Sequence, residues 1–332
     1  VRGNQDSDTG GGIHVGLGRV RLINCLMSGN AAGGNGGGIF AEEADLVLEF
    51  STLAGNRAGG QGGALYGEIT SALSCANMLI WGNEDASGAD APGGSIAGGV
   101  TGSASFKTSL AEGFAPGGDN LDGTLTANDP AFVAPEAPAN APTVDGDYHL
   151  TAGSPVIGVA PASGPDLDLV ERGTTADIGA YEYVSAYAMW VAAHGLTPGV
   201  NDDPDDDPDN DGCPNWKEFA LDGDPLSGVN DGKQRSGFVD VAGTKHFALT
   251  MPVRSGAVFA GTPSPTATVD GITYTIRGSG DLQDWTLEIS EISPSDSFGL
   301  PALNPGWEYR TLVLDDASRR GGFLHAEIQF IP

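Results

Sequence analysis

Residues 27–40, MSGNAAGGNGGGIF, return 26 positions later as residues 53–66, LAGNRAGGQGGALY. Both segments contain a Gly-Asn pair, a second pair of glycines, and two further glycines shortly before an aliphatic residue. They are therefore two copies of one structural unit. Gly-Asn pairs recur at steps of 26, 26 and 27 residues, at Gly3-Asn4, Gly29-Asn30, Gly55-Asn56 and Gly82-Asn83.

Apolar residues keep the same period and lie two positions apart within each unit, as side chains on one face of a strand do. The columns are Val20, Leu46, Leu73; Leu22, Leu48, Cys75; and Met27, Leu53, Ile80. A helical repeat would need a spacing of about 3.6 residues and would not tolerate glycine runs in every unit. Short strands with glycine at the corners predict a right-handed parallel β-helix, whose asparagines form a ladder from coil to coil.

The composition limits the functions that the chain can have. Its 332 residues include 52 glycines, but they show no Gly-X-Y period and 39% of all residues are apolar, so neither collagen nor disorder is expected. Acids outnumber bases by 44 to 15, and the net charge of -29 argues against binding to nucleic acid or to an anionic membrane. Divalent cations or a saline habitat are the natural counterparts of this surface, and plain solubility is the alternative. No apolar run is long enough to span a bilayer.

The cysteines Cys25, Cys75 and Cys213 form no CxxC motif, so we expect free thiols, buried in the case of Cys75. The chain starts at Val1, without Met and within a repeat, which predicts a piece of something longer. The absence of an Asn-x-Ser/Thr sequon favours a bacterial source.

Beyond Asn83 the repeat loosens, with one more coil expected near residues 95–100 and an irregular excursion over residues 115–142. Two ordered segments follow: residues 147–158, DYHLTAGSPVIG, and residues 177–182, DIGAYE. This pair resembles the closing segment of bacterial surface proteins called choice-of-anchor Q. That family usually carries Asp where this chain has Gly158. The resemblance covers residues 1–184 and implies a secreted or surface-displayed β-helix without an established activity.

An acidic run over residues 202–211 contains the strongest chemical motif. Residues 207–218, DPDNDGCPNWKE, fit the pattern D-x-D-x-D-G-x5-E, in which alternate oxygen ligands converge on a calcium ion and glycine permits the turn. The predicted ligands are Asp207, Asp209, Asp211, the Cys213 carbonyl, Asn215 and Glu218. The alternative is a solvated acidic linker. The extra acids of residues 202–206 could shift the register or bind a second ion.

Two helices are expected around this loop, over residues 185–196 and 215–221. The segment resembles the dockerin-like and thrombospondin type 3-like repeats of secreted bacterial proteins, through Asn215, Glu218, Phe219, Ala220, Asp224 and Pro225. The expected role of the ion is structural: bound calcium would turn this self-repelling acidic linker into a fixed joint between the β-helix and the C-terminal part of the chain.

From Gly237 onward, alternating segments predict an antiparallel β-sandwich. The expected strands cover residues 238–241, 246–251, 272–276, 285–289, 309–314 and 323–330. Tyr274, Ser279, Asp281-Leu282 and Trp285 resemble the signature of C-terminal modules that follow such calcium segments in bacterial surface proteins. Trp285 and Trp307 are either core residues or a platform for sugars.

Parallel β-helices also host polysaccharide lyases and hydrolases, which need a base beside acids or calcium, or two carboxylates about 5 to 9.5 Å apart. The histidines lack HxH or HExxH spacing, no GxSxG motif occurs, and His14 is expected on the surface. We therefore predict no catalytic residue. The few bases in the coils are Arg2, Arg19, Arg21, Arg57 and Lys107.

We expect three parts: a β-helix over residues 1–184, an EF-hand-like calcium linker over residues 185–228, and a β-sandwich over residues 237–332. The expected function is a structural or adhesive, calcium-stabilised, non-catalytic fragment of an extracellular bacterial surface protein. One alternative is a carbohydrate-active β-helix enzyme of the lyase type, whose active coils lie either upstream of Val1 or on the face of Arg19 and Arg57. The other is a subunit of an extracellular filament, since an unpaired coil end is an open strand edge. Expected partners are other copies of the chain or a surface polysaccharide.

Overall fold

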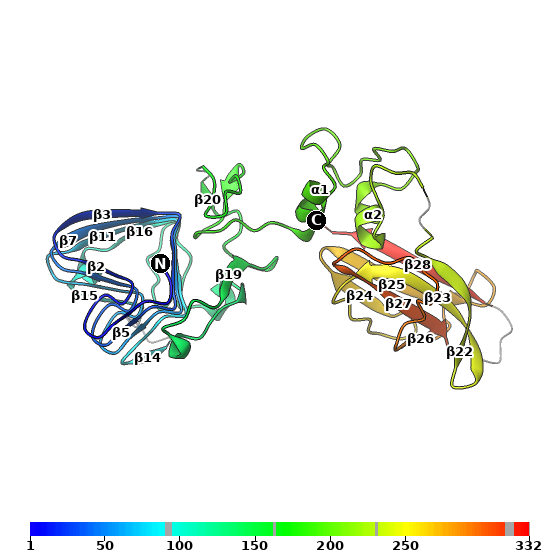
Figure 1. Cartoon of the computed structure of the whole chain (residues 1–332), viewed down its shortest axis with the longest axis horizontal. Coiled ribbons are helices and arrows are strands. Elements are labelled where there is room, and N and C mark those ends of the chain that lie inside the picture. Colours follow the sequence, from blue (N-terminus) through cyan, green and yellow to red (C-terminus); the bar gives the residue numbers. More distant parts are fainter. Residues whose placement is uncertain (90–94, 162–163, 230–231, 316–321, 332) are drawn as a thin grey trace. The chain divides into compact units, whose positions relative to one another are not determined.

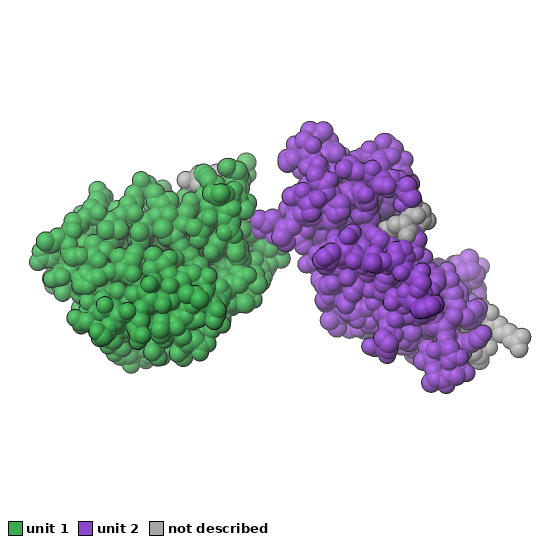
Figure 2. Space-filling model, in the orientation of Figure 1, with its two compact units in different colours: residues 1–183 green, residues 184–332 purple. Residues whose placement is uncertain are grey.

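The computed structural model describes residues 1–89, 95–161, 164–229, 232–315 and 322–331. The chain divides into two compact units, Val1–Tyr183 and Val184–Pro332 (Figure 2). Each unit has its own architecture and its own core, so each is described by itself.

Unit 1 is a β-solenoid, in which short strands of successive coils pair in parallel (Figure 1). The first sheet has the order β2 (Ile13–Val15), β6 (Ile39–Ala41), β10 (Leu65–Gly67), β15 (Ile96–Gly98). The second has the order β3 (Gly18–Ile23), β7 (Ala44–Glu49), β11 (Ala72–Ala76), β16 (Ser105–Lys107). The third has the order β4 (Leu26–Ser28), β8 (Thr52–Ala54), β12 (Leu79–Trp81), β17 (Leu110–Ala111).

The fourth sheet has the order β1 (Gln5–Asp6), β5 (Ala31–Ala32), β9 (Arg57–Ala58), β13 (Glu84–Asp85), β14 (Gly88–Ala89), and only its last pair is antiparallel. The predicted coil near residues 95–100 is confirmed by β15 and the short helix η1 (Gly99–Gly102). Its strand pairs Ile96 with Leu65, 31 residues earlier, so an insertion hides this coil from the 26-residue period.

The apolar columns of the sequence fill the inside of the coils. Leu46, Leu48, Leu53 and Ile80 are at most 1% exposed and belong to one hydrophobic cluster. Glycine is required where coils approach closely: a Cβ on Gly37 would lie 2.4 Å from the carbonyl oxygen of Gly63. The coils therefore stack only because these corners lack side chains.

The predicted asparagine ladder is confirmed. The side-chain Nδ2 atoms of Asn4, Asn30 and Asn56 donate to Oδ1 of the asparagine in the next coil over 3.0, 2.8 and 2.9 Å. Asn56 also donates to the Met27 carbonyl over 2.9 Å and is completely buried. Each buried amide thus satisfies backbone and side-chain groups that no water reaches.

Residues 129–183, which we call the flank segment, run along the side of the stack (green in Figure 1). The segment contains β18 (Phe132–Ala134) paired with β19 (Asp147–Leu150), β20 (Ala160–Pro161) paired with β21 (Thr175–Ala176), and η3 (Pro138–Asn140); η2 (Thr126–Asn128) precedes it. Backbone hydrogen bonds fix it to separate coils, from Thr143 N to Gly29 O and from Gly179 N to Asn77 O. Part of the expected excursion therefore returns to the coils as strand β18.

The flank segment covers the outer face of the third sheet. Leu79 and Leu110 pack against Leu150, Val156 and Ile178 in one buried cluster. Strands β4 and β12 carry apolar side chains on both faces, because successive residues such as Leu26 and Met27, or Leu79 and Ile80, point to opposite sides. The core of the coils buries one face, so another segment must bury the outer one.

Arg172 anchors the DIGAYE end of the flank segment. Its side chain is fully buried, pairs with Glu182 and lies 4.4 Å from the centre of the Phe50 ring. Asp177 accepts hydrogen bonds from the backbone of Gly158 over 2.7 Å and of Tyr183 over 2.5 Å. These contacts give the motif a packing role.

Unit 2 contains two helices and two antiparallel sheets. The helices are α1 (Ala186–Ala193) and α2 (Asn215–Leu221), at the predicted places. One sheet has the order β22 (Arg235–Val241), β23 (Thr244–Arg254), β27 (Trp307–Leu314), β26 (Ile289–Ile292). The other has the order β24 (Thr266–Val269), β25 (Ile272–Ser279), β28 (Phe323–Phe330).

One predicted strand, over residues 285–289, is wrong, because β26 begins only at Ile289. The preceding backbone forms a side-chain-capped turn: Ser279 Oγ accepts from Leu282 N over 2.8 Å, and Asp281 Oδ1 accepts from Asp284 N over 2.9 Å. Strand β24 was not predicted.

Both helices share one core with the two sheets, through Tyr187, Trp190, Phe219, Met251 and Tyr274. The Tyr274 hydroxyl donates to Ala220 O over 2.7 Å, and Trp307 Nε1 donates to Phe219 O over 2.8 Å. The predicted joint is therefore packed into unit 2, whereas the division into three domains stays a prediction.

Candidate metal centre

The acidic loop lies between α1 and α2, and its own carboxylates accept hydrogen bonds from its backbone N–H groups. Asn210 and Gly212 have positive φ angles of 61° and 89°, which turn the chain sharply. Asp207 then accepts hydrogen bonds from Asp211 N over 3.2 Å and from Gly212 N over 2.9 Å. The Asn and Gly of the motif supply the left-handed backbone that closes this turn.

Three carboxylates converge in the loop. One oxygen each of Asp207, Asp209 and Asp211 lies within 4.8 Å of the other two. A calcium ion about 2.3 to 2.6 Å from each oxygen fits such a separation. The structure thus brings together three of the six predicted ligands.

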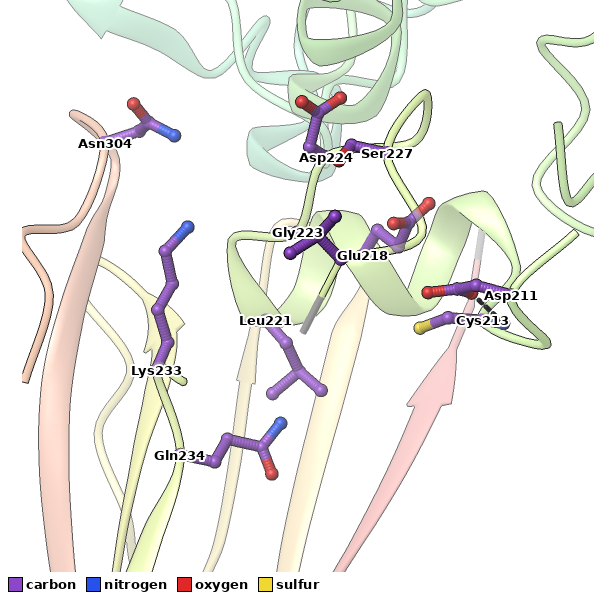
Figure 3. A pocket seen from close by; sticks show the side chains of 11 residues that line it. Asp211, Cys213, Glu218, Leu221, Gly223, Asp224, Ser227, Lys233, Gln234 and Asn304 are labelled. Atoms are coloured by element: carbon purple, nitrogen blue, oxygen red, sulfur yellow. Dashed lines mark hydrogen bonds between the residues drawn. The ribbon is translucent and has the colours of Figure 1, made fainter. Parts of the chain in front are cut away.

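The Glu218 side chain points from α2 toward the same loop (Figure 3), and Glu218 as a whole is only 4% exposed. Burial and the negative charges of Asp209 and Asp211 raise the pKa of Glu218 to about 8. Glu218 Oε2 and Asp209 Oδ2 are buried and have no hydrogen-bond partner among the described residues. Buried acceptors without donors are costly, and a cation between them would remove that cost.

The other two predicted ligands have additional roles. Cys213 N donates to Asp211 Oδ1 over 2.7 Å, which holds that carboxylate in the loop. The fully buried Asn215 donates from Nδ2 to the carbonyls of Asn201 over 3.0 Å and Asp203 over 2.9 Å. Asn215 therefore holds the preceding acidic turn, a role that the spacing of the motif did not indicate, and its ligation of calcium stays a prediction.

The extra acids also stabilise turns. Asp202 Oδ1 accepts from Gly199 N over 2.5 Å, and Asp206 Oδ2 accepts from Asp203 N over 3.0 Å. A second ion at residues 202–206 stays a prediction.

A cavity of about 440 Å³ lies beside the loop, with Glu218, Cys213 and Asp211 on one side and Lys233, Gln234 and Asn304 on the other (Figure 3). Next to it, the buried Asp222 forms an ion pair of 3.0 Å with Lys233 Nζ and accepts from Asn304 Nδ2 over 2.9 Å. These contacts tie Asp222, at the end of α2, to the segments that precede strands β22 and β27.

Among the described residues, Arg19 and Arg57, the two bases considered for a lyase, lie on strands of different sheets. Arg57 on β9 lines a hollow of about 500 Å³ with Gln5, Glu84 and Ser87, whereas Arg19 lies on β3 in another sheet. The exposed His14 packs against Phe40 with ring centres 4.9 Å apart.

The tryptophans considered for sugar binding make separate contacts. The ring of Trp307 packs against Phe219, with ring centres 6.2 Å apart, and against Arg254. The ring of Trp285 contacts His325 at 5.7 Å.

A family model described as the Chlamydia polymorphic membrane protein repeat matches residues 24–42 and 50–68. The matched segments cover strands β4 to β6 and β8 to β10, the corresponding parts of two successive coils. No curated protein and no solved structure matches the chain significantly. Within the described residues, no helix has the length and apolar character needed to cross a bilayer.

Proposed function

We propose that this chain is a structural or adhesin-like part of an extracellular, surface-exposed bacterial protein. The supporting observation is the match of two successive β-solenoid coils to a repeat named for polymorphic membrane proteins. Repeated coils present a long, regular surface, which suits display and adhesion. Within this proposal the coils form a right-handed parallel β-helix of the choice-of-anchor Q type, and the two sheets of unit 2 form a β-sandwich.

Calcium stabilises the dockerin-like loop of unit 2 in this proposal, through Asp207, Asp209, Asp211, Cys213, Asn215 and Glu218. The support is the cluster of three carboxylates together with the partnerless buried oxygens of Asp209 and Glu218. The proposed role of the ion is structural: it joins the loop to α2, which packs in the core of the sheets. No catalytic residue is part of this proposal.

Thermal unfolding of the whole chain in calcium and in excess chelator tests the proposed ion. A ligand at a hundred times its dissociation constant stabilises the folded state by about 2.7 kcal/mol. For a unit of about 150 residues this raises the Tm by roughly 5 to 10 °C. The Asp211→Asn variant should lose the shift, whereas Asp240→Asn, in a distant hairpin, should keep it. An unchanged Tm of the unmodified protein would refute the calcium site.

Adhesion itself is tested by the binding of the purified chain to bacterial surface polysaccharides and to cells. Saturable binding that persists in excess chelator would assign adhesion to the solenoid. Binding that is lost when the chelator removes calcium would assign it to unit 2. Cleavage or depolymerisation of a polysaccharide would overturn the non-catalytic assignment.

A further inference from the structure

His149 lies between two carboxylates in the flank segment. Its Nδ1 atom is 2.5 Å from Asp147 Oδ1, and its Nε2 atom is 2.7 Å from Asp168 Oδ2. The ring also packs on Tyr181, with ring centres 4.1 Å apart. The imidazole therefore joins strand β19 to a turn 19 residues later in the chain.

This geometry selects one protonation state of the ring. An ionised carboxylate only accepts hydrogen bonds, so each of the two contacts needs a proton on the facing nitrogen. Only the imidazolium carries both protons, because a neutral ring would direct a lone pair at one carboxylate. Partial burial acts to lower the pKa of His149, but the hydrogen bonds and charges of Asp168 and Asp147 outweigh it and raise that pKa.

Further charged groups lie near the two carboxylates and Tyr181. Asp166 accepts from Asp168 N over 2.8 Å, which holds the turn in place and adds a negative charge near Tyr181. The nearby cation is Arg2 on the first coil, which acts on Asp147 and Tyr181 and donates to the carbonyls of residues 145 and 146. The groups around the imidazole are thus Asp147, Asp166, Asp168, Tyr181 and Arg2.

We propose that His149 is a pH-dependent clamp, which in its protonated form strengthens the attachment of the turn of residues 166–170 to β19 and loosens it when it loses the proton, while Leu167 N and Glu182 N keep the turn on residues 180–182 through Ala180 O and Asp166 Oδ2. The flank segment covers the third sheet of the solenoid, so the clamp makes the attachment of this cover sensitive to external pH. The inference does not depend on calcium, since all its groups lie in unit 1.

The direction of the effect follows from proton linkage. A histidine whose pKa is higher in the folded than in the unfolded chain stabilises the fold fully below the unfolded value of about 6.5. This contribution is lost as the pH rises through the folded pKa. His149, Asp147 and Asp168 have side chains that are 42%, 46% and 52% exposed, so salt weakens the clamp and low ionic strength reveals it best.

The first experiment measures the ring directly. Nitrogen-detected NMR of the whole chain should show both ring nitrogens of His149 protonated at pH 6, and a titration midpoint above that of the same residue in urea. The Asp168→Asn variant should lower the midpoint. A midpoint at or below the unfolded value, or a neutral ring at pH 6, would overturn the proposal.

The second experiment measures the attachment of the turn. Hydrogen exchange of residues 164–182, corrected for the intrinsic effect of pH, should show protection falling about two- to fivefold between pH 6 and pH 9, the range expected for partly exposed ion pairs. The His149→Gln variant should lose this dependence. A matched control is His246→Gln in unit 2, whose Nδ1 lies 2.8 Å from the Leu314 carbonyl and which should leave the dependence unchanged. The same pH dependence of exchange in the unmodified chain and in His149→Gln would overturn the clamp. If His149→Gln does not fold, Asp168→Asn gives the same test.

Discussion

Replacement of Asn56 by alanine tests whether the asparagine ladder stabilises the solenoid. Asn56 Oδ1 accepts from Asn30 N over 3.0 Å and from Asn30 Nδ2 over 2.8 Å, and its own Nδ2 donates to Asn83 and Met27 over 2.9 Å each. Alanine removes all four hydrogen bonds at a site with no exposure to solvent.

The cost is set by the groups left behind. The backbone N–H of Asn30 loses its acceptor and the Met27 carbonyl loses a donor in a buried place, whereas Asn30 Nδ2 still donates to the Val1 carbonyl over 3.1 Å. Each unsatisfied group costs about 1 to 3 kcal/mol. Asn83 Oδ1 keeps one donor, the backbone N–H of residue 56, and is therefore only partly deprived. We expect a loss of about 3 to 5 kcal/mol, which lowers the Tm of unit 1 by roughly 6 to 20 °C.

Asn4→Ala is the matched control, because Asn4 is exposed and its Nδ2 donates to Asn30 Oδ1 and to the Arg2 carbonyl, while its own side-chain oxygen holds no further rung of the ladder among the described residues. It should cost less than about 1 kcal/mol. Urea unfolding followed by far-UV circular dichroism gives both values. Equal losses for the two variants, or a loss below about 1 kcal/mol for Asn56→Ala, would refute the view that the buried amides hold the coils in register.

Three further predictions follow from single contacts. Arg172→Ala leaves Glu182 without its buried partner and should destabilise the flank segment by about 3 to 5 kcal/mol, measured by limited proteolysis within residues 129–183. Gly37→Ala places a Cβ 2.4 Å from a carbonyl oxygen of the next coil and should lower the Tm by several degrees, whereas Gly16→Ala, with nothing within 4 Å, should not. In chelator, the stability of unit 2 against urea should fall as the pH rises from about 4.3 toward 8, because the raised pKa of Glu218 means that the folded state prefers the protonated acid. Calcium should abolish this trend. A stability that rises over this range in chelator would contradict the prediction.

Features with local causes could be predicted from the order of the residues alone. Glycine at the coil corners, the spacing of two between apolar residues, and asparagine at a fixed step predict stacked strands, because each coil meets the same steric and hydrogen-bonding conditions as the one before it. The acidic loop is equally local: Asn210 and Gly212 turn the chain, so Asp207, Asp209 and Asp211 converge within a few residues. Helix α2 was predicted at its observed bounds for the same reason.

Contacts between residues far apart in the chain could not be predicted in this way, because they arise only when whole segments pack together. Arg172 reaches Asn24, 148 residues away, and His149 finds Asp168 only because the flank segment folds back on itself. The cover over Leu79 and Leu110 is a consequence of side-to-side packing, which no period in the sequence encodes. The role of Asn215 in holding residues 201 and 203 depends in the same way on how the acidic turn lies against α2. Periodic sequence specifies repeated neighbours, whereas single contacts between distant segments follow from the packing of the whole unit.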